Sequence, residues 1–268
     1  MNCLSHEPQT EATATPDAVS PYLSVVVPAF NEEKRLGPSL KRMLTYFDSQ
    51  PYSYEILVVS DGSTDGTEEL VRRIAACRSQ VRLLAYTPNR GKGHAVRYGI
   101  LRAKGERLLF TDADLATPIE EIEKLHSKLD AGYDIAIGSR DMLGSELVKR
   151  QSWLRETAGK TFNRFVRLIT VPGIHDTQCG FKLFSRSAAH TIFSRCRIDH
   201  FAFDVEVLYL AIRVFEFRVA EVPVRWAHQE GSKVHLLRDG LRMVHAVWRI
   251  RTTRYRGITA PSLELPLQ

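Results

Sequence analysis

The chain has 268 residues, of which 44% are apolar, and its formal net charge is +6. This length and composition are typical of a globular protein with one large domain or two small ones. They exclude a membrane-spanning chain, because no apolar run is long enough to cross a bilayer, and a disulfide or metal scaffold, because the four cysteines lack the necessary spacing.

The charge is unevenly distributed along the chain. The first 20 residues carry Glu7, Glu11 and Asp17 without any Lys or Arg, and they are rich in Thr, Ala, Pro and Ser. Because they lack a basic start and an apolar stretch, we expect a disordered tail over residues 1–20 in a cytoplasmic protein, and not a secretory signal. The rest of the chain is basic, which is compatible with phosphate substrates, an anionic membrane surface or nucleic acid.

Strand and helix patterns alternate from Leu23 onward. Apolar runs predict strands over residues 23–27, 54–59, 81–86, 107–111 and 134–138. Helical patterns follow the first four strands, over residues 38–48, from the cap Asp65, over residues 92–103 and from Pro118. Strands that are apolar on both faces and alternate with helices predict an α/β fold, with a mainly parallel sheet covered by helices on both sides.

The second half of the chain has a less regular pattern. It predicts short strands near residues 180–185 and 219–225, a helix over residues 204–215, an amphipathic stretch over residues 151–170 and a final helix over about residues 234–255. No linker composition separates this half from the first. We therefore expect one domain with a C-terminal elaboration.

Two carboxylates, Asp112 and Asp114, directly follow the fourth predicted strand. Side chains at positions i and i+2 of an extended segment point to the same face, so this spacing places the two carboxylates together. Such a pair of hard oxygen ligands suits a Mg²⁺ or Mn²⁺ ion that also holds phosphates. The motif predicts metal-assisted chemistry on a phosphorylated substrate, whereas a solvated acidic loop is the alternative for the motif taken alone.

Polar residues follow all five predicted strands, and parallel strands end at one edge of the sheet, where ligands bind. These exits are residues 28–33, 60–63, 89–93, 112–114 and 138–140. A helix cap or a tight turn would explain any one of these exits, but the occurrence of all five at one edge favours a ligand site. A dinucleotide or Walker-type site is not expected, because the required glycines and the Gly-Lys-Ser/Thr sequence do not follow a strand.

The sequence resembles the family-2 inverting glycosyltransferases, which have the GT-A fold, a Rossmann-like nucleotide-sugar fold. The resemblance rests first on residues 26–32 (VVPAFNE), 60–67 (SDGSTDGT) and 112–114 (DAD). Four further stretches resemble a group within that family, the dolichyl-phosphate β-glucosyltransferases: residues 89–97, 176–184, 201–206 and 230–233. One departure is Ser60-Asp61, where many relatives have two aspartates.

The resemblance implies roles for individual residues. The residues expected to be catalytic are Asp112, Asp114, Asp204 and Arg140, the first two also as ligands of the Mg²⁺ or Mn²⁺ ion. The residues expected to bind the substrates are Pro28, Asn31, Glu32, Asp61, Arg90, Lys92, Gln178 and Lys182. For Arg90, Lys92 and Arg140, expected at phosphates, a plain surface cation is the alternative.

An inverting transfer is a single in-line displacement at the anomeric carbon. A hydroxyl acceptor needs a general base for this step, whereas a phosphate acceptor is already an anion near neutral pH. Asp204 lies where the wider family places its base. We expect it instead to position the sugar or the acceptor.

The implied function is transfer of glucose from UDP-glucose to a polyprenyl phosphate of the dolichyl or undecaprenyl type. The alternatives are transfer of mannose or another hexose to that lipid, a hydroxyl acceptor, and a non-catalytic membrane partner that binds nucleotide sugars. In this interpretation residues 21–257 form the glycosyltransferase domain, with a nucleotide-sugar half over about 21–140, an acceptor half over about 141–257 and a tail over 258–268.

Two basic amphipathic segments would allow contact with a membrane. They are residues 154–169 and the final helix, in which Arg238, Arg242 and Arg249 form one stripe. We expect them to dock on anionic lipid at the cytoplasmic face of a membrane, although packing on the core with a solvated basic face is the alternative. Nucleic-acid binding is not expected, because basic and aromatic residues do not interleave.

Overall fold

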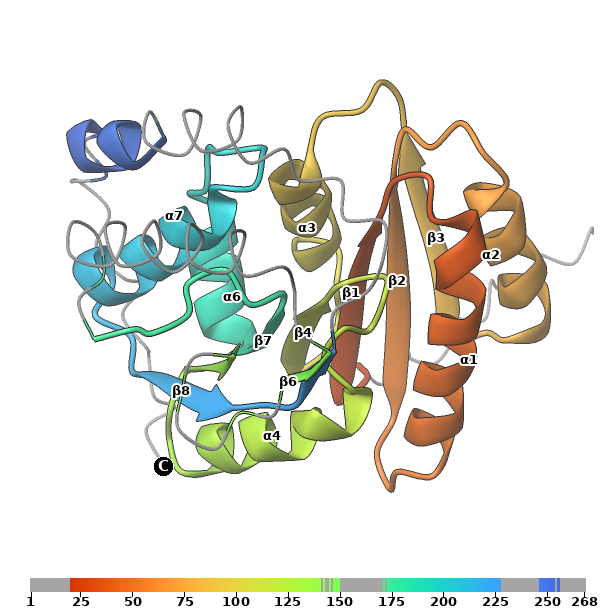
Figure 1. Ribbon diagram of the computed structural model, residues 1–268, viewed down its shortest axis with the longest axis horizontal. Helices are drawn as coiled ribbons and strands as arrows, with labels where there is room; N and C mark the ends of the chain where they lie inside the picture. Colours follow the sequence, from red (N-terminus) through yellow and green to blue (C-terminus); the bar gives the residue numbers. More distant parts are fainter. Residues whose placement is uncertain are drawn as a thin grey trace, which may run out of the picture.

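A computed structural model describes residues 20–140, 142, 145, 147–149, 171, 173–227, 246–253 and 255. Seven strands form one sheet in the order β3-β2-β1-β4-β7-β5-β8 (Figure 1). Their bounds are β1 (Leu23–Ala29), β2 (Tyr54–Asp61), β3 (Val81–Tyr86), β4 (Arg107–Thr111), β5 (Ile135–Ser139), β7 (Phe181–Ser185) and β8 (Val219–Pro223). Neighbouring strands are parallel, except that β7 pairs antiparallel with β4 and β5. The mainly parallel sheet predicted from the sequence is confirmed.

Helices cover both faces of this sheet (Figure 1). α1 (Glu33–Asp48), α2 (Thr67–Cys77) and α4 (Ile122–Asp130) pack in one core cluster, and α3 (Lys92–Ile100), α6 (Arg186–Phe193) and α7 (Phe203–Tyr209) pack in the other. Alternate strand residues enter the two clusters: Val26 lies in one, and Val25 and Val27 lie in the other. This alternation follows from the two-residue period of a strand.

Shorter elements complete the described chain. A 3₁₀ turn, η1 (Ile119–Glu121), precedes α4, and a π-helical turn, η2 (Leu210–Val214), extends α7. β6 (Leu147–Lys149) and β9 (Trp226–Ala227) form a separate two-stranded sheet. Residues 246–252 are helical.

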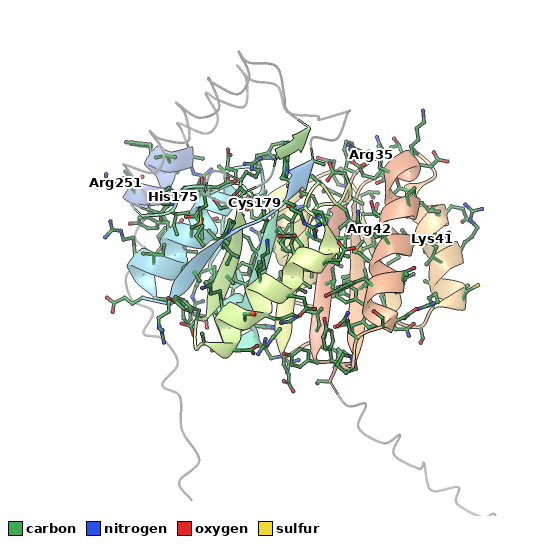
Figure 2. The ribbon with its side chains drawn as sticks, turned by 60° about the horizontal axis from the view of Figure 1, so that its bottom comes forward. Arg35, Lys41, Arg42, His175, Cys179 and Arg251 are labelled. Atoms are coloured by element: carbon green, nitrogen blue, oxygen red, sulfur yellow. The ribbon has the colours of Figure 1, made fainter. Side chains whose placement is uncertain are left out.

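The first helix begins earlier than the sequence predicted. α1 begins at Glu33 and contains Gly37 and Pro38, so the predicted start at residue 38 is wrong. The reason is burial, because Leu36 and Leu40 are both completely buried against the sheet. The apolar area that they remove from water outweighs the low helix propensity of Gly and Pro. Figure 2 shows the exposed face of this helix, which carries Lys41 and Arg42.

β7 joins the two halves of the chain into one folding unit. It comes from the second half, yet it lies between β4 and β5 of the first half. Its side chains Phe181, Leu183 and Phe184 are all completely buried. The two halves of the chain therefore share one sheet, and the functional division near residue 140 stays a prediction.

Several predicted segments lie outside the described residues. These are the tail over residues 1–20 apart from Ser20, the amphipathic stretch over 151–170, most of the final helix over 234–255 and the tail over 258–268. The part of the final helix that is described, 246–252, has the predicted conformation. In the described parts of the chain, no helix has both the length and the apolar character needed to cross a bilayer.

Candidate active site at the carboxyl edge of the sheet

The polar strand exits lie along one edge of the sheet, as predicted (Figure 1). Parallel strands end at the same edge, whereas β7 runs the opposite way and begins there, with Phe181 paired to Thr111. This pairing brings residues 176–180 beside the exit of β4. The Asp112 N–H donates to the Gly180 carbonyl at 3.2 Å.

Asp112 and Asp114 form a pair of half-exposed carboxylates at this edge. Their side chains are 34% and 24% exposed, whereas Ala113 and Leu115 are buried. The two carboxylates thus share the outward face, as their spacing requires. Burial and, next in size, the charge of Asp112 raise the pKa of Asp114 above its ordinary value. The two like charges are therefore close enough to repel each other.

This pair fits a Mg²⁺ or Mn²⁺ site that a phosphorylated substrate completes. A divalent cation between the carboxylates would relieve their repulsion, and both side chains reach solvent. In the part of the chain that the structure describes, no group of three or more His, Cys, Asp and Glu side chains could hold a metal ion. Mg²⁺ is commonly bound through one or two carboxylates together with substrate phosphates, and this pair has that composition.

Two cationic side chains contact the carboxylate pair. The Lys92 Nζ lies 2.6 Å from Asp112 Oδ1, and the Arg35 Nη1 lies 3.7 Å from Asp114 Oδ2. Burial lowers the pKa of Lys92, but Asp112 and other carboxylates outweigh that effect, so the pKa lies above its ordinary value. Arg35 also donates to both carboxylate oxygens of Glu32, each at 2.7 Å. Sequence reasoning missed Arg35, because its position beside Glu32 depends on a helix that begins at residue 33.

Asp61 holds the loop that carries Arg90 and Lys92. Its buried carboxylate accepts four hydrogen bonds: from the Tyr86 hydroxyl, the Asn89 amide, and the backbone N–H groups of Arg90 and Gly91, at 2.7–2.9 Å. The loop itself, residues 87–91, is mostly exposed. Asp61 therefore stabilises the conformation of this loop. Its contact with uracil or ribose stays a prediction.

Lys182 and Asp204 form a buried ion pair behind Asp112. Lys182 Nζ lies 2.5 Å from Asp204 Oδ1 and donates to the Cys179 carbonyl at 2.6 Å, and the two side chains are only 1% and 5% exposed. Burial raises the pKa of Asp204, and the charges of Lys182 and Lys92 offset only part of this. In this structure each of the two residues is the counter-ion of the other. A direct contact of Lys182 with a sugar or phosphate stays a prediction.

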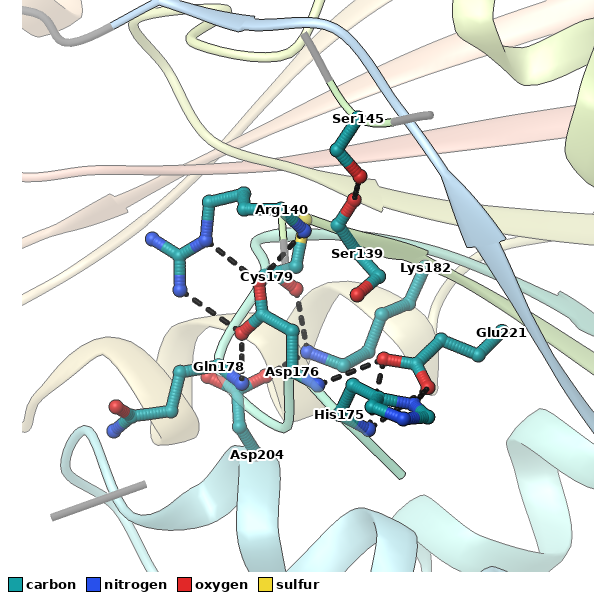
Figure 3. A network of polar contacts seen from close by, with 10 residues as sticks. All are labelled: Ser139, Arg140, Ser145, His175, Asp176, Gln178, Cys179, Lys182, Asp204 and Glu221. Atoms are coloured by element: carbon teal, nitrogen blue, oxygen red, sulfur yellow. Dashed lines mark hydrogen bonds and ion pairs between the residues drawn. The ribbon is translucent and has the colours of Figure 1, made fainter. Parts of the chain in front are cut away.

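Arg140 is fixed by the buried carboxylate of Asp176 (Figure 3). The Arg140 Nε and Nη2 donate to its two oxygens at 2.6 and 2.9 Å, and the Arg140 backbone N–H adds a third bond at 3.1 Å. Burial would raise the pKa of Asp176, but Arg140 outweighs it, so the pKa lies below its ordinary value. The guanidinium also lies 5.5 Å from the centroid of the Trp226 ring. Arg140 is thus held in one orientation at the site.

The loop that carries Asp176 is itself anchored by Glu221 from β8. Glu221 accepts from the backbone N–H groups of His175 and Asp176, at 2.8 and 2.7 Å (Figure 3). The Gln178 backbone N–H donates to Asp176 at 3.1 Å, and its side-chain amide points away from this network. The neighbouring Cys179 is buried, which raises the pKa of its thiol to about 12 and makes it a packing residue.

The exit of β1 is tied to the exit of β2. Pro28 lies inside β1, which continues to Ala29, so the predicted end of the strand before Pro28 is wrong. Asn31 has a left-handed backbone (φ 53°), and its side-chain oxygen accepts from the Thr64 N–H at 2.8 Å. Glu32 is connected to the carboxylate pair through Arg35. A contact of these three residues with a nucleotide stays a prediction.

Gly180 gives a direct test of the position of Asp112. A Cβ atom at Gly180 would lie 2.1 Å from Asp112 Oδ2. We expect Gly180→Ala to displace this carboxylate, which is the end of a side chain, without unfolding the protein. Activity should fall by about tenfold or more, since a small misplacement of a reacting group has large effects. Steady-state kinetics with a thermal melt measures both.

Gly37→Ala is the matched control. A Cβ atom there would make ordinary contacts of 3.6–3.7 Å with Leu70, inside a helix that favours Ala over Gly. Its activity should be unchanged. Equal activity of the two variants would mean that the Asp112 carboxylate does not need this position.

The structure thus brings together most of the residues predicted from the sequence. Lys92 contacts Asp112, and Asp114 shares the outward face with Asp112. Asp204 and Lys182 pair with each other, and Arg140 and Gln178 are connected through Asp176. The side chain of Arg90 has an exposed position on the loop held by Asp61. Three residues were missed: Arg35, Asp176 as the partner of Arg140, and Glu221. For Asp176 a signal existed, since it begins residues 176–184, one of the stretches on which the resemblance rests.

Comparisons with known proteins identify relatives along most of the chain. Residues 24–193 match the family described as "Glycosyl transferase family 2". The dolichyl-phosphate β-glucosyltransferase of Homo sapiens is 38% identical over 264 residues, covering 89% of this chain and 81% of that protein. The enzyme of the same name from Dictyostelium discoideum is 40% identical over 249 residues, covering 88% and 76%.

Solved structures show the same fold at low sequence identity. Glucosyl-3-phosphoglycerate synthase from Mycobacterium tuberculosis, crystallised with Mn²⁺ and UDP-glucose, has a TM-score of 0.63 at 19% identity, covering 86% of this chain and 79% of that one. Mannosyl-3-phosphoglycerate synthase from Rubrobacter xylanophilus has a TM-score of 0.61 at 19% identity, covering 91% and 78%.

Proposed function

This chain belongs to glycosyltransferase family 2, and from that membership we propose that it transfers glucose from UDP-glucose to the phosphate of a polyprenyl lipid, with inversion at the anomeric carbon. It is a glycosyltransferase with the GT-A fold, as the sequence predicted. The identity of 38–40% with two dolichyl-phosphate β-glucosyltransferases, over most of their length, supports the sugar and the acceptor.

The half-exposed carboxylate pair, Asp112 and Asp114, is the observation that carries this proposal. These two residues would hold the Mg²⁺ or Mn²⁺ ion, which, when bound, neutralises the charge that develops on the departing diphosphate. Arg35 contacts Asp114, Lys92 contacts Asp112, and both add positive charge near the same leaving group. A structural neighbour crystallised with Mn²⁺ and UDP-glucose supports a donor of this type.

The Lys182–Asp204 pair favours a phosphate acceptor over a hydroxyl acceptor. The Asp204 side chain is only 5% exposed and its Oδ1 contacts the Lys182 ammonium, so it is poorly placed to reach an acceptor hydroxyl and take its proton. A phosphate oxygen needs no such help, because it is already an anion. In the proposed step this oxygen bonds to the anomeric carbon while the bond to the UDP oxygen breaks, and UDP leaves with the electron pair. Arg140, fixed by Asp176, is suitably held to bind the acceptor phosphate.

A donor and acceptor panel tests this function. Purified protein is incubated with a divalent cation, a UDP- or GDP-sugar and a short dolichyl or undecaprenyl phosphate, and the lipid product is identified by mass. We expect one product, glucosyl phosphopolyprenol, from UDP-glucose. A mannosyl product from GDP-mannose would mean that the transferred sugar is mannose and not glucose. Transfer to hydroxyl acceptors alone would contradict the proposed acceptor. UDP binding without any transfer would favour the non-catalytic alternative.

We also propose that the protein docks on an anionic membrane at its cytoplasmic face, where a lipid acceptor is accessible. In the described helix over residues 246–252, Trp248 is 63% exposed and lies next to the exposed Arg249. An aromatic side chain beside cations is typical of interfacial helices. Replacing Arg249 and Arg251 by Glu should reduce sedimentation with anionic vesicles but not with neutral ones. Unchanged sedimentation would reject docking through this helix.

A further inference from the structure

Asp112 already has an internal counter-ion at the place where a divalent cation would bind. The Lys92 ammonium lies 2.6 Å from Asp112 Oδ1, within hydrogen-bond distance. In the proposed function the same carboxylate is a ligand of Mg²⁺ or Mn²⁺. An ammonium at this distance and a divalent cation repel each other, so they compete for Asp112.

The two ammonium groups near Asp112 each have a carboxylate partner. Lys92 pairs with Asp112, and Lys182 pairs with Asp204. Both ammonium groups lie near the ring of Phe110, at 5.3 and 5.8 Å from its centroid. If a divalent cation takes over the charge of Asp112, Lys92 becomes surplus positive charge in a half-buried position. Such a charge attracts an anion.

The backbone is held by contacts on both sides of Lys92. A change of partner for the Lys92 ammonium therefore requires a rotation of its side chain. The Gly91 N–H donates to Asp61 at 2.8 Å, and the His94 N–H donates to the Asp199 carbonyl at 3.1 Å. A Cβ atom at Gly93 would lie 2.6 Å from the Ile198 carbonyl oxygen. The start of α3 is therefore packed closely against residues 198–199. A lysine side chain has four carbon–carbon rotations with which to move its charge.

We propose that Lys92 is a displaceable counter-ion. Its ammonium neutralises Asp112 in the free enzyme, leaves Asp112 when a divalent cation binds, and then pairs with a phosphate oxygen of the substrate. This inference rests on the proposed function for the identity of the cation and the phosphate. Its consequence is coupling: cation binding creates the free ammonium that a nucleotide diphosphate needs, and by linkage the diphosphate strengthens cation binding.

Lys92→Met separates this role from simpler ones, because it removes the charge and keeps much of the side-chain volume. Calorimetry first measures Mn²⁺ alone and then UDP at saturating Mn²⁺. We expect Mn²⁺ alone to bind about fivefold more tightly than in the wild type, since a competing partly exposed ion pair is worth up to about 1 kcal/mol. UDP should bind about tenfold more weakly, because a charge-assisted bond is lost. The two affinities thus change in opposite directions.

Matched variants define the outcomes. Lys41→Met makes the same charge change on the exposed face of α1 and should leave both affinities unchanged (Figure 2). Should Lys92→Met not fold, Lys92→Gln carries the same two expectations. Unchanged Mn²⁺ affinity with weaker UDP binding would make Lys92 a plain phosphate contact, and weakening of both would make it a structural residue. Absence of Mn²⁺ binding in wild type and variant alike would also overturn the proposal.

These affinity measurements use neither a sugar donor nor a lipid acceptor. They therefore test the role of Lys92 separately from the proposed function. If the donor and acceptor panel gave no glucosyl lipid while the opposite changes were found, Lys92 would still be a displaceable counter-ion. If the panel gave the expected product while Mn²⁺ affinity did not rise in Lys92→Met, only the role of Lys92 would be wrong.

Discussion

Asp114→Asn is expected to lower kcat/KM by about a thousandfold while the fold stays intact. The replacement keeps an oxygen that can accept the Ala116 N–H, which donates to Asp114 at 3.1 Å. It removes the negative charge that would hold the divalent cation, and stabilisation of a leaving group by such charges contributes several kcal/mol to catalysis. Steady-state kinetics at saturating Mn²⁺, with a thermal melt as a check on folding, measures the effect. Asp112→Asn should behave in the same way.

The control is Asp130→Asn, which makes the same chemical change in an exposed side chain that pairs with Arg107, away from the candidate site. Its activity should stay within about twofold of the wild type, because exposed ion pairs contribute little to stability. Removing divalent cations with a chelator should abolish transfer, and added Mn²⁺ should restore it. Full activity of both Asp112→Asn and Asp114→Asn would refute the assignment of the site.

Breaking the Lys182–Asp204 pair is expected to give the largest loss of stability among the changes considered. Either Lys182→Met or Asp204→Asn leaves one charge buried without its partner, and such a change costs about 3–5 kcal/mol of unfolding free energy. Urea denaturation measures it. The double variant Lys182→Met/Asp204→Leu should recover most of this loss, because it leaves no buried charge.

The comparison pair is Arg42–Glu120, at 2.9 Å on the surface of the protein. Breaking that pair should cost less than about 1 kcal/mol, since both side chains stay in water. Equal losses for the two pairs would contradict the inferred cost of leaving one member of the buried pair without its partner.

Asp204→Asn also distinguishes the two acceptor classes. If Asp204 only positions Lys182, the variant that folds should keep the pH dependence of the wild type, whatever its rate. Were Asp204 the general base for a hydroxyl acceptor, turnover would vanish at neutral pH and recover only at higher pH. A pH profile of kcat/KM for the folded variant separates these results.

The sequence by itself determined the architecture and the edge of the sheet that carries the site. Strand and helix periodicity are local signals, so the buried runs before Pro28, Asp61 and Asp112 could be identified without knowing their neighbours. Once the strands are taken as parallel, their polar exits must share one edge. The i, i+2 spacing of Asp112 and Asp114 fixed their common face in the same way, because it depends only on the geometry of the chain between them.

Only the tertiary structure decided which charges are partners. Lys182 meets Asp204 and Arg140 meets Asp176 because β7 runs antiparallel between β4 and β5 and carries residues 176–182 to that edge. Lys92 meets Asp112 because α3, which begins at Lys92, packs against β4. The insertion of β7 is a long-range pairing that no local pattern encodes. Arg35 joined the site for a related reason, since burial of Leu36 extended α1 past Gly37 and Pro38. Electrostatic partnership depends on distance in space, and residues 20–80 positions apart acquire that distance only when the chain has folded.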